Sequence, residues 1–171
     1  MPSIAPLPSL PFTCAPLAGR GIAVLATRAI PANTLLFTEA PLLLLADESH
    51  TTAQHTRVLS AFQRLPKPQR ATFLGLCSNL PPGPKHADAA VALGVWKANN
   101  FCLDSAGTVN GVFALAARLN HACIGGENCR WVWDEAEGLI SFWTDTDVAV
   151  CCGSAWSGRM ETDVTDRRER S

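Results

Sequence analysis

The chain has 171 residues, 47% of them hydrophobic and 17% charged, with a formal net charge of −1 and a pI near 6.4. This composition predicts one globular domain and excludes a largely disordered chain. The near-neutral charge gives no reason to expect a nucleic-acid partner. No membrane association is expected, because the leucine run at residues 42–45 is far too short for a membrane helix.

The N-terminal stretch is rich in proline. Residues 1–16 contain five prolines and no charged side chain, which predicts an extended, proline-stiffened lead-in. A secretory signal would need a basic start and a continuous apolar core. Seven cysteines without such a signal favour an intracellular location, cytoplasmic or nuclear. Cys14, Cys77 and Cys102 are expected to be small buried core residues.

Strand patterns come next in the chain. The residue pattern predicts a strand over 21–27, a turn over 30–33 and a second strand over 34–39. In the second strand, Leu35 and Phe37 are expected on one face. The leucines after Pro41 suit a short strand buried on both faces.

From residue 50 the hydrophobic spacing changes to a helical period. Pro66 ends the first expected helix and Pro68 opens the second, while a third spans residues 87–98. The positions expected to face inward are Val58, Leu59, Phe62, Leu65, Phe73, Leu74, Cys77, Val91, Val95 and Ala98.

The second half returns to strands. We expect a hairpin, a buried helix, two paired strands and an edge strand over residues 102–109, 111–119, 130–133, 139–143 and 147–150. Trp131, Trp133 and Trp143 lie on the paired strands, where core packing and an aromatic wall around a lysine are both open interpretations. Residues 151–171 are expected to form a divergent polar tail, since eight of the last thirteen are charged.

Two polar turns are candidates for ligand binding. Gly19-Arg20-Gly21 precedes the first predicted strand, and glycine lets a backbone lie close against a ligand. Asn120-His121-Ala122-Cys123 follows the predicted buried helix, where polar side chains need hydrogen-bond partners. A ligand or the neighbouring backbone can supply them, so an ordinary turn and a helix cap remain alternatives.

Asn120-His121-Ala122-Cys123 resembles the Asn-His-Ser-Cys motif of SET domains, the protein-lysine methyltransferase fold. The Gly-x-Gly turn, its strand and Ile30-Pro31-Ala32-Asn33 resemble the opening motif of that family, and Asn99-Asn100-Phe101 resembles its Asn-x-Phe. The resemblance covers residues 17–150. It implies an α+β, mainly β, SET-like fold of small sheets, with a helical insert at about residues 50–98 and an incomplete C-terminal closing segment.

The resemblance also implies S-adenosylmethionine-dependent methylation of a lysine in a protein or peptide substrate. The residues that would contact this methyl donor are Arg20, Gly21, Asn99, Asn120 and His121. No metal site is expected, because the spacing of His121 and the later cysteines does not match paired zinc knuckles.

One family feature has no counterpart, because the sequence contains no tyrosine. SET methyltransferases place a tyrosine hydroxyl near the reacting amine, in a segment of the form Gly-Glu-Glu-Leu-x-x-x-Tyr after the last strands. We therefore assign no catalytic residue and expect a truncated chain, inactive as given, or a degenerate homologue. Without that segment, the Trp131 strand and the helix before Asn120 should expose apolar faces. The alternatives are a non-catalytic SET-like interaction module and an unrelated α+β domain.

Overall fold

A computed structural model describes residues 10–17, 21–46, 52–80, 86–119, 127–149 and 158–160. Within these ranges the helices are α1 (Thr52–Arg64), α2 (Lys67–Leu74), α3 (Asp88–Asn99) and the 3₁₀ helix η1 (Ala116–Arg118). The strands are β1 (Phe12–Leu17), β2 (Gly21–Ala26), β3 (Leu35–Glu39), β4 (Leu43–Ala46), β5 (Phe101–Cys102), β6 (Val109–Val112), β7 (Cys129–Asp134), β8 (Leu139–Thr144) and β9 (Gly158–Met160).

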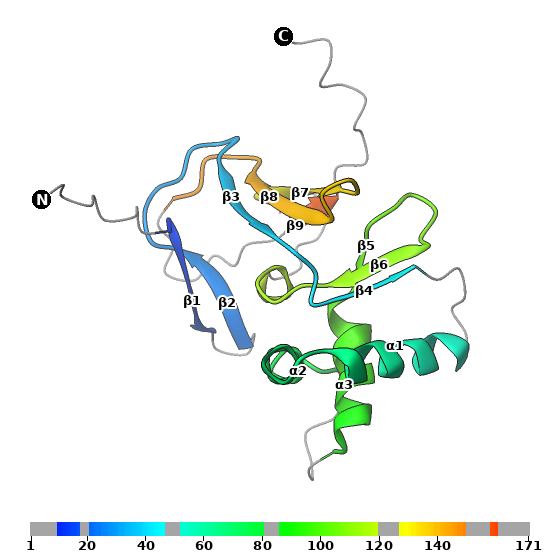
Figure 1. Cartoon of the computed structure of the whole chain (residues 1–171). Helices are drawn as coiled ribbons and strands as arrows, with labels where there is room; N and C mark the ends of the chain where they lie inside the picture. The colour runs from blue at the N-terminus through cyan, green and yellow to red at the C-terminus, as the bar shows by residue number, and fades with distance from the viewer. Residues whose placement is uncertain are drawn as a thin grey trace, which may run out of the picture.

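The strands form three small sheets. β1 and β2 pair as a hairpin, β3-β8-β7-β9 form a four-stranded sheet, and β4-β6-β5 form a three-stranded sheet. Every pairing is antiparallel except that of β7 with β9. Figure 1 shows the three helices together on one side of the β4-β6-β5 sheet, with the four-stranded sheet on the other. The predicted α+β, mainly β fold with a helical insert is confirmed.

Two apolar cores hold these layers together. The first joins the β1-β2 hairpin, the four-stranded sheet and η1, and includes Phe113 and Phe142 with no exposed surface. The second joins the insert helices to β4 and β6 through Val58, Phe73 and Val95, among others. The helical period therefore predicted the apolar side of the insert well. Cys77 and Ala98 are the exceptions, because both residues are exposed.

The turn before β3 forms as predicted and is fixed by β8. The buried Thr144 hydroxyl donates to the Pro31 carbonyl at 2.7 Å and accepts from the Thr34 N–H at 2.8 Å. Asn33 lies in the left-handed region, with φ of +58°. Its Oδ1 accepts a 3.3 Å hydrogen bond from Nη2 of Arg130. Asparagine tolerates this conformation better than most residues.

The N-terminal strand begins earlier than expected. β1 starts at Phe12, inside the segment predicted as a lead-in, and the Phe12 side chain is buried in the first core. Pro16 pairs with Ile22 in this two-stranded sheet. A proline is tolerated there because the strand has a free edge.

The predicted faces of β3 and β4 are wrong in part. Leu36 is buried, whereas Leu35 is 44% exposed, because the register of β3 against β8 shifts between Leu35 and Phe37. Leu44 is also 44% exposed. β4 is an edge strand that covers the insert with one face only, so it is not buried on both faces.

The helix predicted over residues 111–119 is replaced by two shorter elements. β6 continues to Val112, and only residues 116–118 wind into η1. A strand forms here instead of a helix because β6 pairs with both β4 and β5. This pairing satisfies the backbone groups that a helix would bond internally. The predicted edge strand over 147–150 is reduced to a bridge between Ile30 and Val148.

The C-terminal expectation also needs correction. Gly158–Met160, within the predicted polar tail, forms β9 and pairs in parallel with β7. Trp131 is only 6% exposed and Ala116 is fully buried, so the expected exposure of apolar faces is wrong at these positions. The remainder of the predicted tail lies outside the described residues. Within them, no helix has the length and apolarity to cross a bilayer.

The cysteines predicted as core residues are not buried. Cys14, Cys77 and Cys102 are exposed, whereas Cys129, the first residue of β7, is buried in the first core. Burial, followed by the nearby Asp145 carboxylate, raises the pKa of the Cys129 thiol from 9.0 to about 12. At neutral pH this thiol is therefore a protonated core group.

We predict that Asn33→Ala lowers the unfolding free energy by about 1–2 kcal/mol, because alanine is strained at positive φ. Asn33→Gly loses the same bond to Arg130 without the strain, so it serves as the matched control. Urea unfolding of both variants measures the difference. Equal stability of the alanine and glycine variants would show that the left-handed conformation is not maintained.

Because the pKa of the Cys129 thiol is raised in the folded protein, we predict that the free energy of unfolding depends on pH. It stays protonated in the folded protein to about pH 12 but ionises near pH 9 once unfolded. Its contribution to stability is complete below pH 9 and is lost as pH rises toward 12. The stability difference between the native chain and Cys129→Ala should therefore shrink by roughly 1 kcal/mol between pH 9 and 10. A difference that stays constant would contradict burial of this thiol.

Candidate functional site

Two of the five predicted donor-contacting residues can be placed. Gly21 opens β2, and Asn99 ends α3. Arg20, Asn120 and His121 lie outside the described residues. The site is therefore built from the two placed residues and from the backbone that leads directly to Asn120.

Gly21 has the geometry expected of a residue beside a ligand. Its φ is +71°, in the left-handed region that favours glycine. Among the described residues, no heavy atom lies within 4 Å of the position that a Cβ would occupy. The backbone conformation therefore accounts for the glycine, and none of the described side chains fills the space beside it.

The Glu39 carboxylate fixes the backbone before the Asn-His pair. Its Oε1 accepts hydrogen bonds from the N–H groups of Ala114 at 2.7 Å and Leu115 at 2.8 Å, and its Oε2 from Ala116 at 3.0 Å. These amides begin η1, where backbone N–H groups have no partner within the helix. Charge-assisted bonds to three consecutive amides hold η1 against the end of β3.

η1 lies between the two cores. Ala116 is fully buried in the first core, and the neighbouring Ala117 packs against the second. Leu119 packs against the first core, and its N–H donates to the carbonyl of Ala116 at 3.0 Å. The backbone is therefore fixed up to the residue directly before Asn120.

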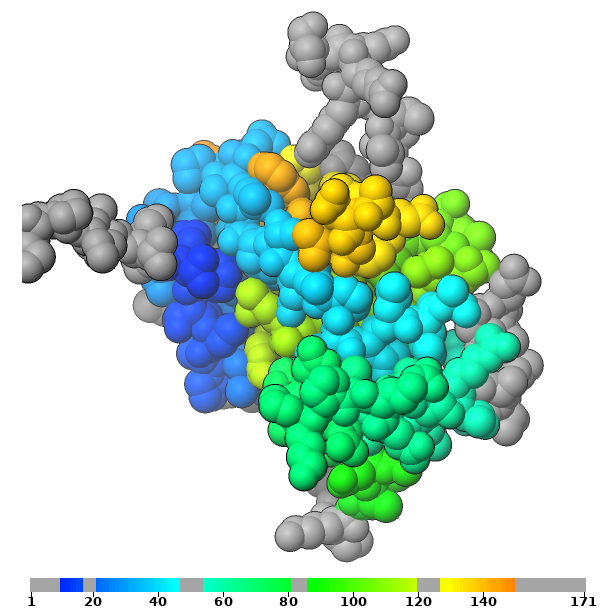
Figure 2. Space-filling view, in the orientation of Figure 1, coloured from blue at the N-terminus to red at the C-terminus, as the bar shows by residue number. Residues whose placement is uncertain are grey.

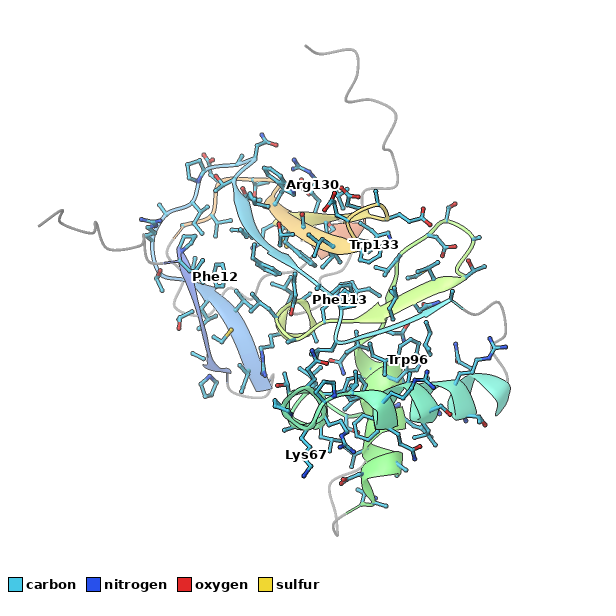
Figure 3. The ribbon with its side chains drawn as sticks, in the orientation of Figure 1. Phe12, Lys67, Trp96, Phe113, Arg130 and Trp133 are labelled. Carbon is cyan, nitrogen blue, oxygen red and sulfur yellow. The ribbon has the colours of Figure 1, made fainter. Side chains whose placement is uncertain are left out.

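β2, which starts at Gly21, is in contact with η1, which ends two residues before Asn120. Figure 1 shows η1 as a small coil beside β2, between the hairpin and the insert. Figure 3 shows Phe113 at the same place, where its ring contacts Phe101 and Trp133 edge-on. The strand that starts at Gly21 and the segment that leads into Asn120 thus belong to one packed unit.

Asn99 has a structural role that the sequence did not reveal. Its Nδ2 donates to the Cys77 carbonyl at 2.6 Å and to the Val95 carbonyl at 2.7 Å. Both amide hydrogens are used to join the end of α3 to the segment after α2. Among the described residues no donor reaches its Oδ1, so a ligand contact at Asn99 would have to be accepted by this oxygen.

Core packing accounts for two of the three tryptophans. The Trp131 ring lies 5.7 Å from that of Phe101, and the Trp133 ring 6.3 Å from that of Phe113, both edge-on. Trp143 lies on the other face of the sheet, opposite Arg130. Trp131 and Trp133 therefore complete the core under the site.

Sequence reasoning missed Glu39 as a functional residue. Its available signal was a carboxylate at the end of an apolar strand, which is costly unless it is paired. That signal does not identify three amides that lie 75 to 77 positions away. Within the described ranges, no cluster of three or more potential metal ligands is found.

The small sheets, the helical insert and the contact between β2 and η1 are the features to compare with known families. A family model for the SET domain matches residues 21–150, which is more than half of the chain. The chain therefore belongs to the SET-domain family, as the two motifs predicted. The match begins at Gly21, the last residue of the Gly-x-Gly turn, and includes the insert and the Asn120–Cys123 motif. No curated protein matches the chain.

We predict that Glu39→Ala destabilises the protein by roughly 2–4 kcal/mol, because three partly buried amides lose their acceptor. Glu137→Ala, at an exposed position in the β7–β8 hairpin, is the control and should change stability by less than about 0.5 kcal/mol. Urea unfolding measures both. Hydrogen exchange at Ala114, Leu115 and Ala116 should accelerate in the Glu39 variant; unchanged exchange there would refute the proposed anchoring.

Proposed function

We propose that this chain is a SET domain that binds S-adenosylmethionine and descends from the protein-lysine methyltransferases. The observation that carries the proposal is the packing of β2 against η1, because it joins the strand that starts at Gly21 to the segment that leads into Asn120. Family membership gives the type of ligand. Two further observations agree with a bound ligand: none of the described residues fills the space beside Gly21, and none of them donates to Oδ1 of Asn99.

Each candidate residue has a separate task in the proposal. Arg20 and the backbone of Gly21 hold the methionine end of the donor, and the Asn120 side chain binds the same end. The backbone at His121 contacts the adenine. Asn99 accepts a hydrogen bond through Oδ1. Bound S-adenosylmethionine supplies a methyl group on a sulfonium, for transfer to a neutral amine.

Methyl transfer itself is proposed to be weak or absent. In-line displacement requires both reactants to be held in alignment, and effective alignment supplies a large part of the rate. The chain contains no tyrosine that could place a hydroxyl at the reacting amine. We therefore propose a truncated or degenerate family member that is inactive as given, with a lysine-containing protein or peptide as its ancestral substrate.

The absence of tyrosine also favours a second function, a non-catalytic module that binds a protein partner between the insert and the strands. An intracellular location, cytoplasmic or nuclear, would suit both functions. It agrees with the exposed free thiols of Cys14, Cys77 and Cys102, which persist best in a reducing compartment.

Calorimetric titration with S-adenosylmethionine tests the proposal. We expect saturable binding to the native chain, strong loss of binding in Asn120→Ala, and no change in Asn79→Ala, where the same substitution falls on an exposed residue after α2. A methylation assay on a lysine-peptide library should give little or no product. No heat of binding with a folded chain would reject the donor site, and rapid turnover would reject the inactive assignment.

A further inference from the structure

The charges of this chain are separated between its insert and the remainder. No aspartate or glutamate lies between Glu48 and Asp88, although this stretch contains five basic residues, Arg57, Arg64, Lys67, Arg70 and Lys85. The rest of the chain has nine lysines and arginines against fifteen acidic residues. The small net charge therefore conceals a stretch of +5 beside a remainder of −6.

Three of the basic residues meet where α1 joins α2, and we call Arg64, Lys67 and Arg70 the α1–α2 corner. Arg64 is in the last turn of α1, Lys67 starts α2, and Arg70 follows one helical turn later. Arg64 and Lys67 are exposed, and Arg70 is half-buried. Figure 3 shows Lys67 pointing away from the body of the protein. In Figure 2, atoms of residues 52–80 lie at the molecular surface on the side that faces the viewer.

The α1–α2 corner carries positive charges that the described part of the chain does not pair. Among the described residues, no carboxylate forms an ion pair with Arg64, Lys67 or Arg70. The Nε of Arg70 is buried and has no hydrogen-bond partner. A buried donor without a partner carries a desolvation cost.

The start of α2 adds to the positive potential. Pro66 occupies the N-cap without a side-chain cap, and the first turn contains no acidic residue. The N-terminus of a helix is the positive end of its dipole, so Lys67 lies where a negative charge would stabilise the helix. This arrangement costs local stability and at the same time attracts anions.

We propose that the α1–α2 corner binds an acidic segment of a protein partner, independently of donor binding. Arginine binds carboxylates through paired hydrogen bonds, and two arginines with one lysine suit several closely spaced glutamates or aspartates. Single exposed ion pairs are weak, so the segment must contact several of these groups together. A long nucleic acid fits less well, because its backbone beyond the corner would meet a remainder of net charge −6.

The test is fluorescence anisotropy of the full chain with a labelled eight-residue peptide that contains four glutamates. The control peptide has glutamine at those four positions. Lys67→Gln should weaken binding about twofold to threefold, and the combined Arg64→Gln, Lys67→Gln and Arg70→Gln variant by roughly tenfold. Lys97→Gln removes an exposed charge from α3 outside the corner and should leave the affinity unchanged. Added salt should weaken binding throughout.

Several results would overturn the proposal. Equal losses in Lys67→Gln and Lys97→Gln would show attraction to overall charge without a defined surface. Equal binding of the glutamine peptide, or no binding at low salt, would also reject it. Tighter binding of a single-stranded RNA of matched charge would replace the acidic peptide with a nucleic acid. If the triple variant no longer folds, as judged by loss of its thermal transition, the single variant Lys67→Glu at an exposed position replaces it. Unchanged affinity of that variant for the acidic peptide would reject binding at the α1–α2 corner.

Discussion

Three hydrogen bonds to one carboxylate determine the position of the candidate site. The Glu39 carboxylate accepts hydrogen bonds from the N–H groups of Ala114, Leu115 and Ala116, which lie 75 to 77 positions further along the chain. This contact sets where η1 begins, and the two alanines that follow direct it into both cores. The approach to Asn120 is therefore fixed by β3 and by core packing together. The Gly21 strand packs on the same core, so both motifs depend on this arrangement.

The sequence predicted the family and most elements, because those depend on local patterns. The helical period, with Pro66 and Pro68 as boundaries, located the insert, and the alternation along β7 and β8 located that hairpin. The errors concern tertiary choices. Residues 111–119 are apolar enough for a helix, but pairing of β6 on both edges and the Glu39 carboxylate divide them into a strand and η1. A register shift, which no local pattern shows, buries Leu36 in place of Leu35.

The insert combines two roles on opposite sides of its helices. Its apolar side packs on β4 and β6 through the second core, and Asn99 joins the end of α3 to the segment after α2. Its outer side has the exposed Arg64 and Lys67, which no carboxylate among the described residues pairs. Asn99 shows why a family motif alone does not define a contact. Its amide hydrogens already support the fold, which leaves only Oδ1 for a ligand. The missing tyrosine separates the proposed donor binding from methyl transfer.

The most direct measurement is an NMR titration of the isotope-labelled chain with S-adenosylhomocysteine, the donor without its methyl group. If the Gly21 strand and η1 lead to one ligand site, the amide signals of Gly21 and Leu119 should shift together and follow a single dissociation constant. The amide of Glu137, in the distant β7–β8 hairpin, should not move. A shift at only one of the two positions, or different dissociation constants for the two, would contradict a shared site.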